Sequence, residues 1–129
     1  MKAIVVHQPG PPEVLCYEEI PTPAVRPGWS LVKVQAVGVN RSEIFTRQGL
    51  SPTVTFPRIL GIECVGVVAD STTPTLVPGQ KVAALMGGMG REFDGGYAEY
   101  ILLPNDRIWP IHTLSLIHIS EPTRLLSIS

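Results

Sequence analysis

The sequence predicts a mainly β fold: a partly open barrel of short strands with one or two short helices. Two observations support this. About seven short runs rich in Val, Ile and Leu are separated by turn residues, which is the pattern of a compact antiparallel β structure. In addition, 13 prolines and 12 glycines among 129 residues leave little room for long helices, since both residues destabilise helix interiors. The length suits one domain.

The expected strands follow from β-branched residues bounded by Pro and Gly. The clearest run lies at residues 30–37, where Val32, Val34 and Ala36 alternate with more mixed residues. This alternation predicts one apolar face and one mixed face. The complete set of expected strands covers residues 2–7, 15–20, 30–37, 63–69, 81–85, 97–103 and 107–111.

One short helix is expected to begin at Asn40. Asn40 and Glu43 have the spacing of a capping box, in which each residue can satisfy a free amide of the other. Glu43 and Arg47 are four residues apart in the favourable acid-before-base order. Gly49 is a natural stop.

Composition excludes several classes of function. The formal net charge of −1 gives no basic surface for nucleic acid. No run reaches the ~20 apolar residues that a membrane span needs, and the first residues do not resemble a signal peptide. We therefore expect a cytoplasmic protein, with Cys16 and Cys64 as free thiols.

Two apparent ligand motifs do not withstand inspection. Gly87 to Gly90 resembles a phosphate loop, but no helix follows it, so we expect a mobile loop between strands. Residues 1–111 contain one histidine, His7, and two widely separated cysteines. A zinc site needs three or four ligands at close range, so no metal is expected.

Two polar features remain open on the residues alone. Asn40, Arg41 and Ser42 cluster directly after a strand, and they serve either as a helix start or as a functional site. Glu63 lies in an otherwise apolar segment, where a carboxylate either has a structural partner or lines a cleft.

The ordered motifs resemble the N-terminal, GroES-like domain of medium-chain dehydrogenases/reductases, and within them the zinc-independent quinone oxidoreductases. The resemblance covers residues 1–111. It is carried by MKAIVV at the start, KVQAVGVN at 33–40, PRILGIECVG at 57–66, VPGQKV at 77–82 and GGYAEY at 95–100.

The resemblance also assigns site residues. Zinc alcohol dehydrogenases of this family have a metal-binding Cys where this chain has Asn40, and a metal-binding His where it has Ile62. An amide and an alkyl chain do not hold zinc. The family implies Asn40 and Ser42 as catalytic residues, and Asn40 with Arg41 as cofactor contacts. It implies Phe45, Ser51 and Glu63 as substrate-pocket residues.

The resemblance implies the substrate-side domain of a homodimeric, NADPH- or NADH-dependent enzyme that reduces quinones or α,β-unsaturated carbonyls without zinc. On this interpretation the nucleotide-binding Rossmann domain is missing, and the chain alone has no bound cofactor and no activity. One alternative is a stand-alone GroES-like barrel that binds a partner without catalysis. Another is a fragment of a zinc alcohol dehydrogenase.

The end of the chain has a different character. Residues 114–124 resemble the in-frame translation of a transposase adapter used in short-read sequencing libraries, and Ile128 and Ser129 match its continuation. We therefore expect a GroES-like domain at 1–111 and a non-native tail at 112–129.

Overall fold

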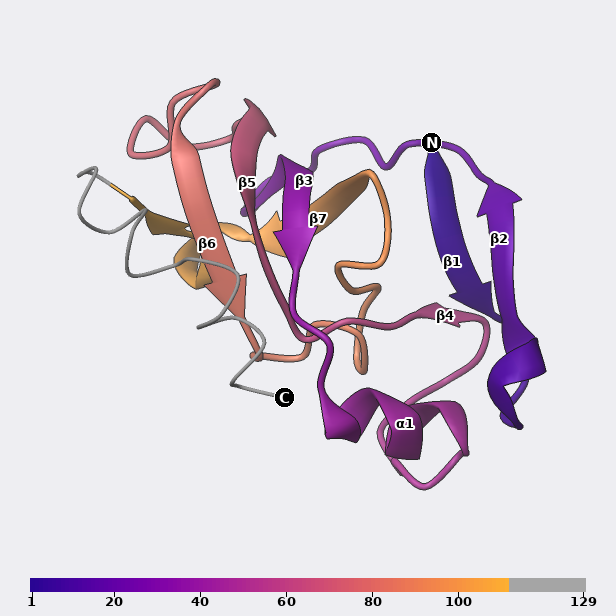
Figure 1. The fold of residues 1–129 in the computed structure, drawn as a ribbon. Helices are drawn as coiled ribbons and strands as arrows, with labels where there is room; N and C mark the ends of the chain where they lie inside the picture. The colour runs from indigo at the N-terminus through magenta and orange to yellow at the C-terminus, as the bar shows by residue number, and fades with distance from the viewer. Residues whose placement is uncertain (112–129) are drawn as a thin grey trace.

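The computed structural model describes residues 1–111, in which eight strands form two antiparallel sheets. The smaller sheet has the order β2-β1-β4, and the larger has the order β7-β3-β5-β6-β8. Figure 1 shows the two sheets on opposite sides of the molecule, and helix α1 lies at the end toward which β3 points. The bounds of the elements are β1 Lys2–Val6, β2 Leu15–Glu19, β3 Trp29–Val37, α1 Arg41–Arg47, β4 Arg58–Ile59, β5 Glu63–Asp70, β6 Lys81–Leu85, β7 Tyr100–Pro104 and β8 Trp109–Pro110, with 3-10 turns at Pro12–Val14 and Asn105–Arg107.

The predicted mainly β fold with a short helix is confirmed, and most strands lie within a few residues of their predicted positions. The prediction missed β4, whose two residues pair with Val5 and Val6 of β1. A strand of two residues has no periodicity to detect, because its position depends on a partner far away in the chain.

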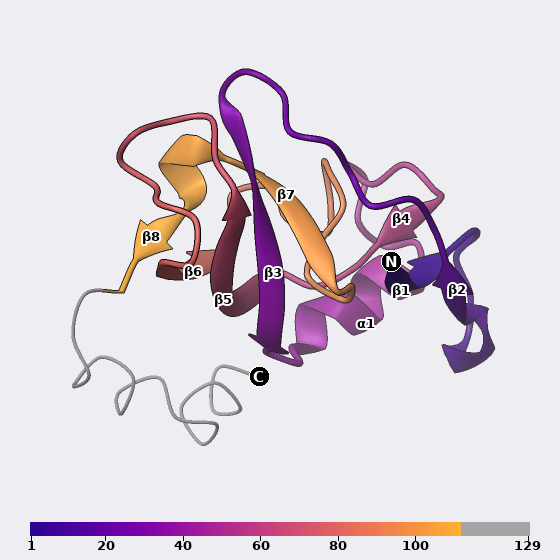
Figure 2. The ribbon, with the colours of Figure 1, turned by 90° about the horizontal axis from the view of Figure 1, so that it is seen from above.

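The segment before β7 also differs from the prediction of one strand over residues 97–103. Tyr97 and Glu99 hydrogen-bond to β1, through Ile4 and Lys2, while β7 itself pairs with β3 from Tyr100 onward. The segment therefore passes from the smaller sheet to the larger one, which joins the two sheets into a barrel-like unit. Figure 2 shows this arrangement from above.

Strand β3 is more buried than its alternation predicted. The consecutive residues Ser30, Leu31 and Val32 are all buried, with exposed fractions of 0%, 8% and 1%. The register of β3 against β5 shifts between Leu31 and Val32, so simple alternation of the two faces does not describe the start of this strand. The main core cluster contains Val32, Cys64, Val68, Leu76, Val82, Ala84, Met89, Ile101, Leu103 and Ile108.

The glycine-rich segment 87–96 packs against the core, which differs from the mobile loop that we expected. Met89 is 1% exposed and belongs to the core cluster. A Cβ atom on Gly95 would lie 2.2 Å from the carbonyl oxygen of Gly61, so only glycine allows this close backbone approach.

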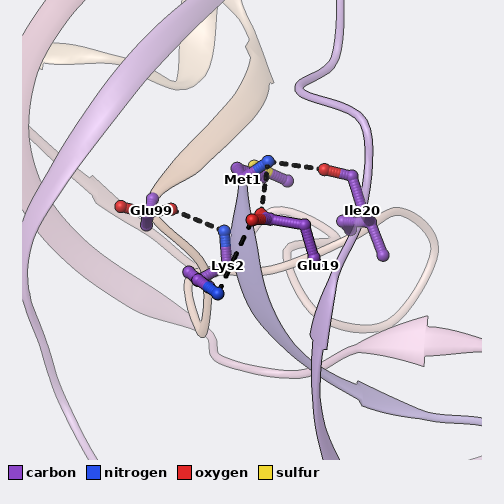
Figure 3. A network of polar contacts seen from close by, with 5 residues as sticks. All are labelled: Met1, Lys2, Glu19, Ile20 and Glu99. Atoms are coloured by element: carbon purple, nitrogen blue, oxygen red, sulfur yellow. Dashed lines mark hydrogen bonds and ion pairs between the residues drawn. The ribbon is translucent and has the colours of Figure 1, made fainter.

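The beginning of β1 is fixed by polar contacts (Figure 3). The ammonium group of Met1 donates to the carbonyl of Ile20 and pairs with Glu19 at 3.2 Å. The main-chain amide of Lys2 donates to the Glu99 carboxylate. The Glu19 side chain is 64% exposed, so its ion pairs contribute little stability.

Cys16 and Cys64 are free, as expected, with Cys16 half-buried and Cys64 buried. Among residues 1–111, no helix is both long enough and apolar enough to cross a membrane. The predicted non-native tail, residues 112–129, lies outside the described residues.

Candidate functional site

Helix α1 starts as predicted. Asn40 has an extended backbone, with φ −121° and ψ 151°, and the capping box with Glu43 is present. The carboxylate of Glu43 accepts a hydrogen bond from the main-chain amide of Asn40. The helix ends at Arg47, and Gly49 follows with a φ of +86°, a conformation that favours glycine.

The helix has two sides that differ in their surroundings, because residues three or four apart share a face. Asn40, Glu43, Ile44 and Arg47 lie on the side that borders a pocket. Arg41 and Phe45 lie on another side and are exposed, with Phe45 at 50%.

Glu43 connects the helix start to the larger sheet. Glu43 is buried, with 6% of the residue exposed. Besides the amide of Asn40, it accepts from the main-chain amide of Ile62 at 3.1 Å and, at 3.4 Å, from Nδ2 of Asn40. Two backbone amides and one side chain therefore depend on a single carboxylate, which fixes α1 relative to the segment before β5.

Glu63 is the second buried carboxylate, with 3% of the residue exposed. Its Oε1 accepts from Nδ2 of Asn40 at 3.2 Å, so the structural partner that the sequence left open is present. A Cβ atom on Gly38 would lie 1.6 Å from this oxygen. Glycine at position 38 therefore provides the space in which Glu63 lies.

Asn40 is held between these two carboxylates. Carboxylates accept and the Nδ2 group donates, so the contacts with Glu43 and Glu63 orient the carboxamide. Asn40 itself is 6% exposed. The residue that the resemblance placed at the catalytic centre is thus also part of a buried polar network.

A pocket of about 380 Å³ opens beside this network. Sequence reasoning missed Tyr97 as one of its lining residues, although Tyr97 lies in the GGYAEY motif. Burial raises the pKa of the Tyr97 phenol, and the nearby Glu43 and Glu63 raise it further. Tyr97 is therefore a protonated hydrogen-bond donor rather than an acid. The lining, which is mostly apolar, consists of Ile4, Leu15, Val37, Val39, Asn40, Glu43, Ile44, Arg47, Leu60 and Tyr97.

The other predicted site residues lie around α1 but outside the lining of this pocket. Arg41 is exposed, and Ser51 is half-buried. The hydroxyl oxygen of Ser42 is buried and has no hydrogen-bond partner within residues 1–111. A buried hydroxyl without a partner is costly, so Ser42 differs from the buried Asn40 and Glu43, whose side chains do have partners.

The donor set beside Asn40 does not fit zinc. Asn40 contributes a carboxamide and Ile62 an alkyl chain, which leaves Glu43 and Glu63 as the acidic groups. Within the part of the chain that the structure describes, no three His, Cys, Asp or Glu side chains are grouped to hold a metal ion. Structural and catalytic zinc sites need at least three protein ligands.

The geometry agrees with the comparisons to known proteins. The family model of the alcohol dehydrogenase GroES-like domain matches residues 26–113. The chain belongs to this family. The resemblance inferred from the sequence motifs is therefore confirmed, and relatives of this GroES-like chain include quinone oxidoreductases.

Two relatives illustrate the range of names in the family. The quinone oxidoreductase of Mus musculus is 34% identical over 118 residues, which cover 86% of this chain and 33% of the relative. The trans-enoyl reductase ACTTS2 of Alternaria alternata is 36% identical over 110 residues, covering 81% and 31%. The GroES-like chain thus spans about a third of the length of these curated relatives.

Solved structures show the same fold. The quinone oxidoreductase from Coxiella burnetii is 32% identical with a TM-score of 0.76, and the match covers 85% of this chain and 36% of that one. AibC is 27% identical with a TM-score of 0.81, covering 88% and 38%.

Proposed function

We propose that residues 1–111 form the substrate-side domain of an NAD(P)H-dependent, zinc-free oxidoreductase that reduces quinones or α,β-unsaturated carbonyl compounds. The observation that carries this proposal is the hydrogen bond of 3.2 Å between Asn40 and Glu63. It lies where zinc enzymes of the resembling family bind their metal. Without a Lewis acid to polarise an alcohol, an already electron-poor quinone or enone is the more suitable substrate.

The residues around α1 suit this chemistry. When bound, the nicotinamide cofactor supplies the hydride. The family resemblance gives Ser42 the role of donating to the oxygen that becomes negative as hydride arrives. Its hydroxyl is buried outside the lining of the pocket beside Asn40 and has no competing partner within the described residues. The carboxamide of Asn40, held by Glu43 and Glu63, keeps one orientation beside the reacting group.

The exposed side of α1 and the pocket side of α1 suit separate roles in binding the cofactor and the substrate. Arg41 is exposed at the start of α1, where a guanidinium can bind a cofactor phosphate. The apolar pocket beside Asn40 suits the carbon body of a quinone or enone. Phe45, Ser51 and Glu63, which the resemblance assigns to substrate binding, lie outside the lining of this pocket, and their role stays a prediction.

A homodimeric state and a cytoplasmic location stay predictions as well.

The test is turnover by the intact oxidoreductase that carries this domain. We expect NADPH or NADH oxidation with a quinone and with an enone, unaffected by a metal chelator, and no oxidation of a simple alcohol. Asn40→Ala should lower kcat/KM by about a hundredfold, the typical loss when an oriented polar group of the active site is removed.

Stoichiometric zinc in the intact enzyme together with chelator-sensitive alcohol oxidation would reject the proposal. A separate expectation is that the 129-residue chain alone is inactive, and oxidation of NADPH by a quinone above a no-protein control would contradict it.

A further inference from the structure

A second recess lies away from α1, between the end of β4, the start of β3 and the glycine-rich segment. Its volume is about 210 Å³. None of its lining residues also lines the pocket beside Asn40, so an inference from it does not depend on the proposed oxidoreductase function. The side chains that define its chemistry are Arg26, Trp29, Arg58, Phe93, Asp94 and Tyr100.

A turn builds one wall of this recess. The amide of Trp29 donates to the carbonyl of Arg26 at 2.9 Å, and Gly28 between them has a φ of +83°. Pro27 followed by Gly28 is suited to this type of turn. The turn places the Arg26 guanidinium 4.2 Å from the centre of the Trp29 ring. Phe93 meets Trp29 edge to face, with ring centres 5.2 Å apart. The result is an aromatic wall with a cation on it.

Arg58 contributes a second cation that is poorly neutralised. Its side chain is 17% exposed, and its one ion pair, with Oδ1 of Asp94, measures 3.4 Å. The same oxygen accepts from the main-chain amide of Ile59 at 3.0 Å, and the Asp94 side chain is 56% exposed. The Nε atom of Arg58 is buried without a partner within residues 1–111. Within the described residues, the guanidinium therefore has donors beyond the Nη1 contact with Asp94 that no protein acceptor satisfies.

The backbone around Arg58 and Asp94 is closely fitted. The amide of Gly95 donates to the carbonyl of Ile59 at 2.7 Å, which adds to the bond between Ile59 and Asp94. A side chain on Gly95 would collide with Gly61, so the two backbones are in close contact here. The two charged side chains thus stand on a defined frame.

We propose that this recess binds a small organic carboxylate with an aromatic or short apolar body. Two arginines face one aspartate, so the recess favours an anion. A planar guanidinium matches a carboxylate through two parallel hydrogen bonds, and the Trp29, Phe93 and Tyr100 side chains contact the apolar body. The volume is below the ~300 Å³ of sites for drug-sized ligands, which restricts the ligand to about one ring.

The probe is 4-fluorobenzoate, observed by fluorine NMR during titration with the 129-residue chain. We expect saturable broadening and a shift of its resonance. The neutral isostere 4-fluorobenzamide should bind more weakly by about tenfold, because it lacks the charge that Arg58 and Arg26 neutralise. Asp94→Asn should tighten binding of the carboxylate, since it removes the competing internal anion.

Substitutions of arginines inside and outside the recess distinguish specific binding in the recess from a general effect of positive charge. Arg58→Gln should weaken binding by about tenfold, and Arg58→Lys should weaken it less. Arg107→Gln removes an arginine that is exposed and lies outside the recess lining, so it should leave binding unchanged. If Arg58→Gln does not fold, Arg26→Gln, at an exposed residue, gives the same test.

Equal affinity for the carboxylate and the amide would overturn the proposal. So would equal effects of Arg58→Gln and Arg107→Gln, or a resonance that shifts without saturation. None of these results bears on NAD(P)H-dependent reduction at the Asn40 site, which is tested by turnover.

Discussion

The two sides of helix α1 differ in what holds their polar groups. On the pocket side, Asn40 and Glu43 are buried and joined to Glu63 and to the backbone by several hydrogen bonds. On the other side, Arg41 and Phe45 are exposed, and the Arg41 side chain has no hydrogen bond or ion pair among the described residues. One short helix therefore combines a rigid polar network with side chains that are free to meet a ligand.

This difference separates stability from recognition. Removing a group from the network leaves buried partners without bonds, which costs stability. Changing an exposed side chain leaves the fold nearly unaffected. The same helix should therefore respond to mutation in two distinct ways. Four measurements, on the buried network, on the residues packed beside Glu63 and on the exposed side of α1, test this difference, beginning with the largest expected effect.

Glu43→Gln should lower the free energy of unfolding by about 3 kcal/mol, because an amide group cannot replace both acceptor oxygens and leaves a buried main-chain donor without a partner. Urea unfolding of the 129-residue chain measures this. Glu13→Gln is the matched control, since Glu13 is exposed. Equal losses in the two variants would show that the Glu43 network does not stabilise the fold.

Gly38→Ala should lower the free energy of unfolding by about 2 kcal/mol, the usual cost of overpacking a buried site. The added methyl group would lie 1.6 Å from Oε1 of Glu63. In a Glu63→Ala background the same substitution should cost much less, which a double-mutant cycle detects. Purely additive effects would mean that Glu63 does not fill the space beside Gly38.

Stability should fall in alkaline solution because of Cys64. Burial, and then the neighbouring Glu63, raise the pKa of the Cys64 thiol from 9.0 to about 12. Above 9.0 the unfolded chain loses this proton while the folded chain keeps it, so stability declines from there toward the folded-state pKa. One pH unit above 9.0, the loss should be about 1 kcal/mol.

Thermal or urea unfolding across this pH range tests the Cys64 prediction. Cys64→Ala should remove this part of the decline, and Cys16→Ala, at the half-buried free cysteine, should not. The raised pKa of Tyr97 adds a further decline above 10.0. A Cys64→Ala variant with an unchanged pH dependence would disprove the assignment.

Arg41→Ala and Phe45→Ala should have the smallest effect on stability, each below about 1 kcal/mol. Under the proposed function, Arg41 matters for cofactor binding instead: in the intact enzyme, Arg41→Ala should raise the KM for the cofactor by about tenfold, because a charged hydrogen bond is lost. A large loss of stability in either variant would show that this side of α1 packs against the fold.

The sequence was sufficient wherever the signal was local. The capping box of Asn40 and Glu43, the stop at Gly49 and most strands were predicted correctly, because each depends on residues within a few positions. Prediction from the sequence failed where an element depends on contacts with a segment far away in the chain. Strand β4, the change of sheet before Tyr100 and the position of Tyr97 in the pocket all depend on β1, which lies more than fifty residues earlier.

The chemical identity of the site was determined by the sequence alone: an amide at Asn40 and an alkyl chain at Ile62, where zinc ligands would be needed, can be read without coordinates. Only the tertiary structure decided what these residues contact. Asn40 and Glu43 are neighbours at the start of α1, whereas Glu63 opens β5; the three meet because β3, which leads to Asn40, pairs with β5 in the larger sheet. The space for Glu63 exists because Gly38 has no side chain. Residue type is a property of one position, whereas burial and partnership depend on the whole packed chain.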